Sequence, residues 1–265
     1  MWDKYEVPRS EGTRIHHIGT TLICVAAVIS GEGDLLSAMP MYDAGTPMKK
    51  TTRKKAEPFL ALPPLDDPVW YRFFINSSEH YELLPGYPQM PVCVKLKEAF
   101  SLPPGADLTG WIFSKIEARI LVSGTELVSF PLAKPHKTLY GTPESGVICR
   151  HDEAQFLTSS EPMFESMLTD PGLVAHPVRL RNTSSAAVRV NELCIYGEQL
   201  SIFWTGTRMQ SERLSFVFGT SGVRMSLDGQ GSHQSDWTTI TKPRVSGEER
   251  FIERSFELFK AMTRL

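Results

Sequence analysis

The sequence predicts an all-β protein, built as two tandem antiparallel β-sandwich-like halves that are followed by a C-terminal amphipathic helix. In many short runs, such as Leu214–Phe218, apolar and other residues alternate with a period of two. Nineteen glycines and nineteen prolines place turn signals every ~8–12 residues, a spacing typical of sandwiches and barrels. The length of 265 residues suffices for one large domain or two of ordinary size.

The predicted strands are short apolar or alternating runs that are bounded by turn residues. In chain order they are Thr21–Ile29, Leu35–Met39, Val69–Ile75, Tyr81–Leu84, Val92–Leu96, Gly110–Phe113, Ala118–Val122, Glu126–Phe130, Val147–Arg150, Ala154–Leu157, Pro177–Arg181, Val188–Cys194, Leu200–Trp204, Arg213–Phe218, Val223–Leu227 and Trp237–Ile240.

A weak internal similarity indicates the two halves. Asn76 and Asn182 each end an apolar run and are followed by small hydroxyl residues, which form Asx and Ser/Thr turns that satisfy freed backbone groups. We therefore expect one β-sandwich-like domain over residues 1–150 and a second over residues 151–245, with a helix over residues 246–265.

Two helices are predicted. The first, Ser160–Leu168, starts with a capping serine and an early proline. The second begins with a capping box at Ser246 and Glu249. It carries a wide apolar stripe, which either packs on the chain's own sheet or contacts a partner or a second copy. The stripe consists of Phe251, Phe256, Leu258, Phe259 and Met262.

Charge and hydropathy exclude some classes of function. A net charge of −2 gives no basic footprint for nucleic acid. The basic run Lys49–Lys55 indicates a solvated loop, and an anion-binding patch stays open as the alternative. The longest apolar run, Leu22–Ile29, is far shorter than the ~20 residues that span a bilayer. We therefore expect a soluble protein without a membrane span.

The cysteine pattern predicts free thiols and no structural metal. Cys24, Cys93, Cys149 and Cys194 each lie in a separate apolar run, without CxxC spacing. Such thiols fit a reducing cytoplasm. No nucleotide loop is complete, so no cofactor is predicted.

The segment Leu139–Arg150, which reads LYGTPESGVICR, resembles the hallmark of domain of unknown function 432, an uncharacterised prokaryotic family. The stretches Trp2–Glu6, Leu60–Pro63 and Leu102–Gly105 fit the same pattern. His151 departs from it, because an aromatic residue is expected there. The resemblance implies cytoplasmic β-rich proteins without an assigned activity, and it suggests an association with genes beside small-conductance mechanosensitive channels.

This segment also contains the candidate ligand site, Tyr140, Glu144, Arg150 and His151. An arginine beside a glycine-rich turn can bind a carboxylate or phosphate, although we favour an internal Glu144–Arg150 ion pair that fixes the turn. Cys149 and His151 share a strand face, but at roughly 6–7 Å they are too far apart for a nucleophile pair.

Two functions follow as hypotheses. The first is a non-catalytic binding or adaptor protein that presents a protein-interaction surface, for a partner or a second copy. The second is a small-ligand protein for an anion or a sugar, or a hydrolase-like enzyme, with its site at the turn Tyr140–His151. Convergence of the candidate side chains in a pocket favours the second, and an exposed apolar patch favours the first.

Overall fold

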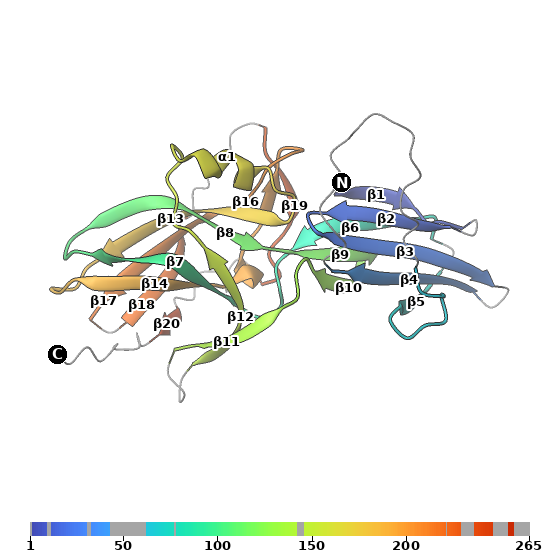
Figure 1. Cartoon of the computed structure of the whole chain (residues 1–265), viewed down its shortest axis with the longest axis horizontal. Coiled ribbons are helices and arrows are strands. Elements are labelled where there is room, and N and C mark those ends of the chain that lie inside the picture. The colour runs from blue at the N-terminus through green and yellow to red at the C-terminus, as the bar shows by residue number, and fades with distance from the viewer. Residues whose placement is uncertain are drawn as a thin grey trace. The chain divides into compact units, whose positions relative to one another are not determined.

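Strands make up most of the described chain, which confirms the predicted all-β class (Figure 1). The structure is a computed structural model and describes residues 2–9, 12–30, 33–42, 62–76, 78–141, 146–220, 222–228, 236–245 and 254–256. Within these residues the helical elements are α1 (Pro162–Leu168) and the 3-10 turn η1 (Gly197–Gln199).

Contacts divide the chain into two compact units that are not consecutive in sequence. The first comprises Met1–Pro85 and Glu117–Lys134, and the second comprises Gly86–Ile116 and Pro135–Leu265. This arrangement differs from the linear halves expected from the sequence. Residue 150 lies inside a strand of the second unit, and that strand pairs with residues 92–96 from an earlier part of the chain.

The first unit contains two four-stranded sheets, ordered β1-β6-β9-β10 and β2-β3-β4-β5. Their strands are β1 (Asp3–Glu6), β2 (Thr13–Ile18), β3 (Thr21–Ser30), β4 (Gly33–Met41), β5 (Tyr71–Ile75), β6 (His80–Gly86), β9 (Glu117–Val122) and β10 (Thr125–Pro131). Side chains of the two sheets meet, since Tyr71 of β5 lies against Phe130 of β10 with ring centroids 5.3 Å apart.

The continuous apolar run of β3 is explained by burial on both faces. One face of β3 lies toward the other sheet. On the opposite face Cys24 and Ala26 form a buried cluster with Trp70. Trp70 is held in place because its indole N–H donates a hydrogen bond to the Pro63 carbonyl at 3.2 Å.

The second unit contains a four-stranded sheet, ordered β11-β12-β7-β14, and a larger sheet, ordered β19-β15-β16-β13-β17-β18-β20 with β8 also paired to β13. Its strands are β7 (Val92–Leu102), β8 (Asp107–Lys115), β11 (His136–Tyr140), β12 (Val147–Ala154), β13 (Leu173–Asn182), β14 (Val188–Ile195), β15 (Ile202–Trp204), β16 (Met209–Gln210), β17 (Arg213–Gly219), β18 (Gly222–Asp228), β19 (Thr238–Thr241) and β20 (Arg254–Phe256).

Not all of these pairs are antiparallel, and in this respect the prediction was wrong. Strand β12 is parallel to β7, and β13 is parallel to both β16 and β17. Parallel neighbours require long crossover connections. The connection from β7 to β12 passes through strands of the first unit, which local alternation in the sequence does not reveal.

The short helix α1 confirms the first predicted helix. Its first residue is Pro162, and its N-cap is Glu161 instead of the expected Ser160. Glu161 is fixed because its Oε1 accepts a hydrogen bond from the Thr158 N–H at 2.8 Å. Phe164 packs in the core near Trp111 of β8. Within the described residues, no helix is long and apolar enough to cross a membrane.

The predicted C-terminal helix is contradicted where the structure describes it. Residues Arg254–Phe256 form β20, which pairs antiparallel with β18 and places Phe256 opposite Val223. A sheet edge offers unpaired backbone groups, and strand pairing there overrides helical periodicity. Phe251, Leu258, Phe259 and Met262 lie outside the described residues, as does the basic run Lys49–Lys55.

Candidate functional site

The hairpin of β11 and β12 carries the residues that the sequence singled out. The two strands pair antiparallel, with Tyr140 opposite Val147 and His136 opposite His151. Because β12 also pairs with β7, β11 is the terminal strand of its sheet. The turn starts at Gly141, whose φ of 101° is a backbone conformation that side chains oppose and glycine accepts. This glycine therefore has a structural role.

The hairpin separates the candidate ligand residues. Arg150 and His151 are consecutive in β12, so their side chains project to opposite faces of the sheet. Tyr140 shares the face of Cys149 and His151, because cross-strand partners lie on one face. Arg150 and His151 are therefore not brought together, and Glu144 lies outside the described residues.

Asp152 lies on the same face of β12 as Arg150 and is buried. Its Oδ2 accepts a hydrogen bond from the Lys115 backbone N–H at 2.8 Å, and its Oδ1 lies 3.5 Å from Lys115 Nζ. Oδ1 also accepts a hydrogen bond from the Glu153 N–H at 3.0 Å. Both carboxylate oxygens are thus engaged in fastening β8 to β12, which is a structural role.

A cluster of thiols occupies the other face, and the sequence reasoning missed it. Cys194 of β14 lies directly opposite Cys93 of β7, and Cys149 Sγ is 3.8 Å from Cys194 Sγ. All three are buried and free. The sequence places these cysteines in three separate runs, and only the pairing order β12-β7-β14 brings them together.

The surroundings of these thiols raise the pKa of Cys93 and Cys194 and lower that of Cys149. Burial raises the pKa of Cys93, and the Glu192 carboxylate at 3.7 Å from its sulfur raises it further. The hydrogen bond between Cys149 and Cys194 lowers the pKa of Cys149 and raises that of Cys194. Burial also raises the pKa of the neighbouring Tyr140 hydroxyl. Thiols with a raised pKa, here Cys93 and Cys194, are weak nucleophiles at neutral pH.

Cys149 and His151, considered above as a nucleophile pair, each have a partner of their own. Cys149 Sγ lies 3.4 Å from the Val147 carbonyl oxygen as well as near Cys194. His151 Nε2 lies 3.7 Å from Glu153 Oε1. The imidazole and the thiol are thus engaged separately. Among the described residues, no group of three or more His, Cys, Asp or Glu side chains is placed to hold a metal ion.

The most unusual feature of the hairpin is an exposed apolar pair. Leu139 and Ile148 lie directly opposite each other on β11 and β12. Their exposed fractions are 44% and 62%, although both residue types normally avoid water. No sequence signal predicted this exposure, because both residues belong to runs that looked like buried strands.

Comparison with known protein families identifies the family of this chain. A family model described as "Protein of unknown function (DUF432)" matches residues 31–261. The chain belongs to this family. The family that the segment Leu139–Arg150 resembles is thereby confirmed. Searches of curated proteins and of solved structures found no match.

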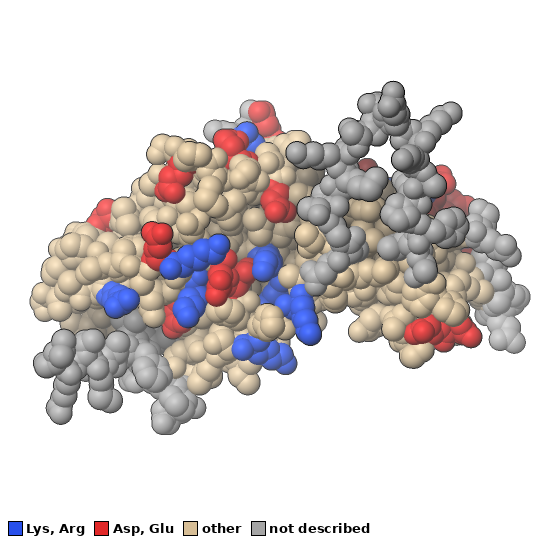
Figure 2. All heavy atoms as spheres, in the orientation of Figure 1, with Lys and Arg blue, Asp and Glu red and all other residues tan. Residues whose placement is uncertain are grey.

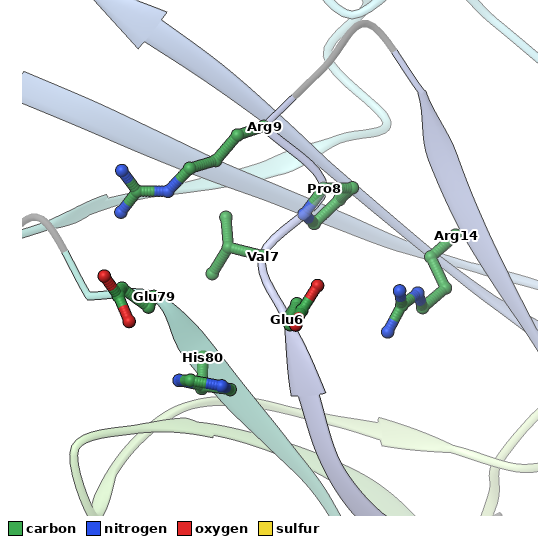
Figure 3. Close-up of a pocket in the computed structure, with 7 residues that line it drawn as sticks. All are labelled: Glu6, Val7, Pro8, Arg9, Arg14, Glu79 and His80. Atoms are coloured by element: carbon green, nitrogen blue, oxygen red, sulfur yellow. The ribbon is translucent and has the colours of Figure 1, made fainter.

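A second candidate site of this DUF432 protein is a cleft of about 620 Å³ in the first unit. Figure 3 shows charged side chains from β1, β2, β6 and the connections beside them around it. Its lining is Glu6, Val7, Pro8, Arg9, Arg14, Glu79 and His80.

The charges of the cleft do not select one class of ligand. Arg9 lies 3.2 Å from Asp34 Oδ2 and donates a hydrogen bond to the Ser78 carbonyl at 3.1 Å. The Arg14 guanidinium lies over the Tyr5 ring, 5.4 Å from its centroid. Both arginines therefore have partners within the protein, and carboxylates lie beside them.

Two buried histidines in the DUF432 fold have structural partners. In the first unit His16 Nε2 is 2.6 Å from the Tyr81 hydroxyl, and burial lowers the pKa of His16 to about 4. In the second unit His176 lies between Ser114 and Ser211, and burial lowers its pKa to about 3. Both imidazoles are therefore neutral at physiological pH and link strands within their units.

Proposed function

We propose that this DUF432 protein is a non-catalytic binding or adaptor protein that presents a protein-interaction surface on the hairpin β11–β12. The observation that carries the proposal is the exposed pair Leu139–Ile148. Covering a large aliphatic side chain stabilises a complex by ~1.5–3 kcal/mol at most. A partner that covers both residues therefore gains binding energy that the isolated chain does not use.

The first unit has an apolar row of its own, which supports an adaptor with two contact surfaces. Val28, Leu35 and Phe74 are successive cross-strand partners on β3, β4 and β5. Phe74 is 80% exposed and Val28 is 41% exposed. Because each compact unit carries an exposed apolar group, one chain can hold two different protein surfaces.

The geometry of the hairpin speaks against the small-ligand or hydrolase alternative. Arg150 and His151 project to opposite faces, and Asp152 is engaged by Lys115. Burial raises the pKa of the nearby Cys93 thiol. A ligand-binding site or an activated nucleophile requires charged and nucleophilic side chains that lie close together and point toward one another. A cytoplasmic location is part of the proposal, supported by four free cysteines.

Cross-linking in the native cell tests the interaction surface. The tagged wild type is compared with the double variant Leu139→Ser/Ile148→Ser and with Met163→Ser, an exposed residue of α1 that serves as the matched control. We expect specific cross-linked partners for the wild type and Met163→Ser, and their loss in the double variant. Equal cross-linking in all three, with unchanged circular dichroism, contradicts the proposal.

A further inference from the structure

We infer that the partner of this surface is an extended segment that adds as a strand to the open edge of β11, with an acidic and an apolar side chain alternating on one of its faces. The inference rests on the proposed function and specifies the chemistry of its partner. Three observations carry it: the position of β11 in the sheet, the side chains on one face of β11, and the charge around them.

The position of β11 makes strand addition possible. Among the described strands β11 pairs with β12 alone, at one end of the order β11-β12-β7-β14. On a terminal strand, alternate backbone N–H and C=O groups point away from the sheet. The strand comprises the five residues His136–Tyr140, which match about 17 Å of extended peptide.

The side chains of β11 specify what the added strand carries. Lys137 and Leu139 are two residues apart and therefore share a face. Both are exposed, and Ile148 extends the apolar part of that face across the strand pair. A partner strand thus places an apolar residue directly beside Leu139, and Ile148 lies on the other side of Leu139, one strand further into the sheet. Two residues further along, the same face of the partner strand places a carboxylate beside Lys137, because side chains on one strand face recur every second residue.

The charge of β11 favours a foreign partner over a second copy. The sequence His136–Tyr140 contains a lysine and a histidine and no acidic residue. Two β11 edges that pair in parallel place Lys137 beside Lys137, where like charges repel, and two that pair antiparallel about Thr138 place Lys137 beside Leu139, so neither arrangement gives the ammonium an acidic partner. Over β7, β12 and β14, Figure 2 shows lysine and arginine interspersed with carboxylates, so this side of the unit does not repel an acidic peptide.

The other exposed apolar row is a weaker candidate for strand addition. Its terminal strand β5 is overlaid by the chain itself, because Arg72 donates hydrogen bonds to the carbonyl groups of Leu65 and Asp67 at 2.6 and 2.7 Å. The outer edge of β11 is the end of the order β11-β12-β7-β14 among the described strands. The hairpin therefore offers both an open edge and an apolar contact.

Fluorescence anisotropy with labelled peptides tests the inference on the full chain. The probe is a peptide of repeated Thr-Glu-Thr-Val units, and the charge control is made of Thr-Lys-Thr-Val units. Two further probes are N-methylated, one at the threonines and one at the Glu and Val positions. Strand addition uses the N–H groups of only one alternate set, so we expect one N-methylated probe to lose binding and the other to keep it.

Variants locate the binding to β11. We expect Lys137→Glu to weaken the Glu probe about fivefold and to strengthen the Lys probe by a similar factor, as for an exposed charge pair. Leu139→Ser/Ile148→Ser should weaken both probes about tenfold, and Met163→Ser should change neither. Binding of both N-methylated probes at full affinity, or no response to Lys137→Glu, overturns the inference.

The peptide and cross-linking results separate the two proposals. If no probe binds but the cellular cross-links still depend on Leu139 and Ile148, strand addition is wrong and the interaction surface stands. If the probes bind as expected but the cross-links survive the double variant, the edge binds peptides and the proposed function fails. Loss of both effects removes both proposals.

Discussion

His176 Nε2 lies 2.8 Å from Ser114 Oγ inside the second unit, and His176 Nδ1 lies 2.8 Å from Ser211 Oγ. The Ser211 hydroxyl donates its proton to the Glu212 carbonyl oxygen at 2.7 Å. Ser211 therefore accepts from Nδ1–H, and Nε2 accepts from Ser114, because a neutral imidazole has one donor and one acceptor. The network satisfies every polar atom of the ring only while His176 stays neutral.

This network predicts a loss of stability in acid. Burial lowers the pKa of His176 to about 3, whereas an unfolded histidine titrates near 6.5. Below pH 6.5 the His176 imidazole is protonated in the unfolded chain but stays neutral in the native state. The free energy of unfolding should therefore fall by about 1.4 kcal/mol per pH unit from this group as the pH drops from 6.5 toward 3. His16, with its pKa lowered to about 4, adds in the same direction.

Urea denaturation at a series of pH values measures this dependence, and His176→Gln identifies its source. The variant should be less stable at pH 7, because the hydrogen bonds change, but its stability should vary less between pH 6 and pH 4. His17→Gln, at an exposed position of β2, is the matched control and should keep the wild-type slope. An unchanged slope in His176→Gln would show that another group carries the proton.

The exposed hairpin pair predicts variants that spare stability. Ile148→Ser should change the free energy of unfolding by less than about 1 kcal/mol, because only a cross-strand pair contact is lost. Leu193→Ala, at a completely buried position of β14, should cost about 2–5 kcal/mol. Thermal and urea melts compare the two. A cost above about 2 kcal/mol for Ile148→Ser would mean that the pair is part of the core.

The buried thiols predict a protein that resists thiol reagents while folded. Cys24, Cys93, Cys149 and Cys194 are all free and buried, and burial raises the pKa of both Cys24 (to about 11) and Cys93. We expect little reaction with a disulfide reagent in native conditions and reaction of all four thiols in urea. A single thiol that reacts rapidly at pH 7 in the folded state would indicate an activated cysteine and reopen the enzyme hypothesis.

The sequence predicted well what depends on local pattern. Alternating runs such as Leu214–Phe218 became strands, and Pro162 opens the short helix. The sequence did not predict strand pairings that depend on segments far apart in the chain. The parallel contact of β12 with β7, and the pairing of Arg254–Phe256 with β18, depend on neighbours that periodicity does not encode.

The candidate site shows the same division. Strand parity alone places Arg150 and His151 on opposite faces, and this could be read from the sequence. The cluster of Cys93, Cys149 and Cys194 could not, because it requires the order of three strands. The exposure of Ile148 also escaped prediction, since an apolar residue in a strand is buried only where a second layer of side chains covers it.

The turn after β13, which the sequence predicted at Asn182, contributes to stability through the side chain of this asparagine. Asn182 is buried, and its Nδ2 donates hydrogen bonds to the carbonyl oxygens of Leu102 and Ala186, both at 2.8 Å. Its Oδ1 accepts from the Ser184 N–H at 2.9 Å, as an Asx turn requires. Asn182→Ala should therefore cost about 2–4 kcal/mol, because buried backbone groups lose their partners.

Asn76, which follows β5 in the similar segment, is exposed. The matched variant Asn76→Ala should change the free energy of unfolding by less than about 0.5 kcal/mol. Urea denaturation of both variants measures the difference. Equal losses in the free energy of unfolding would contradict the prediction, because they would mean that the burial of the Asn182 amide adds nothing to stability.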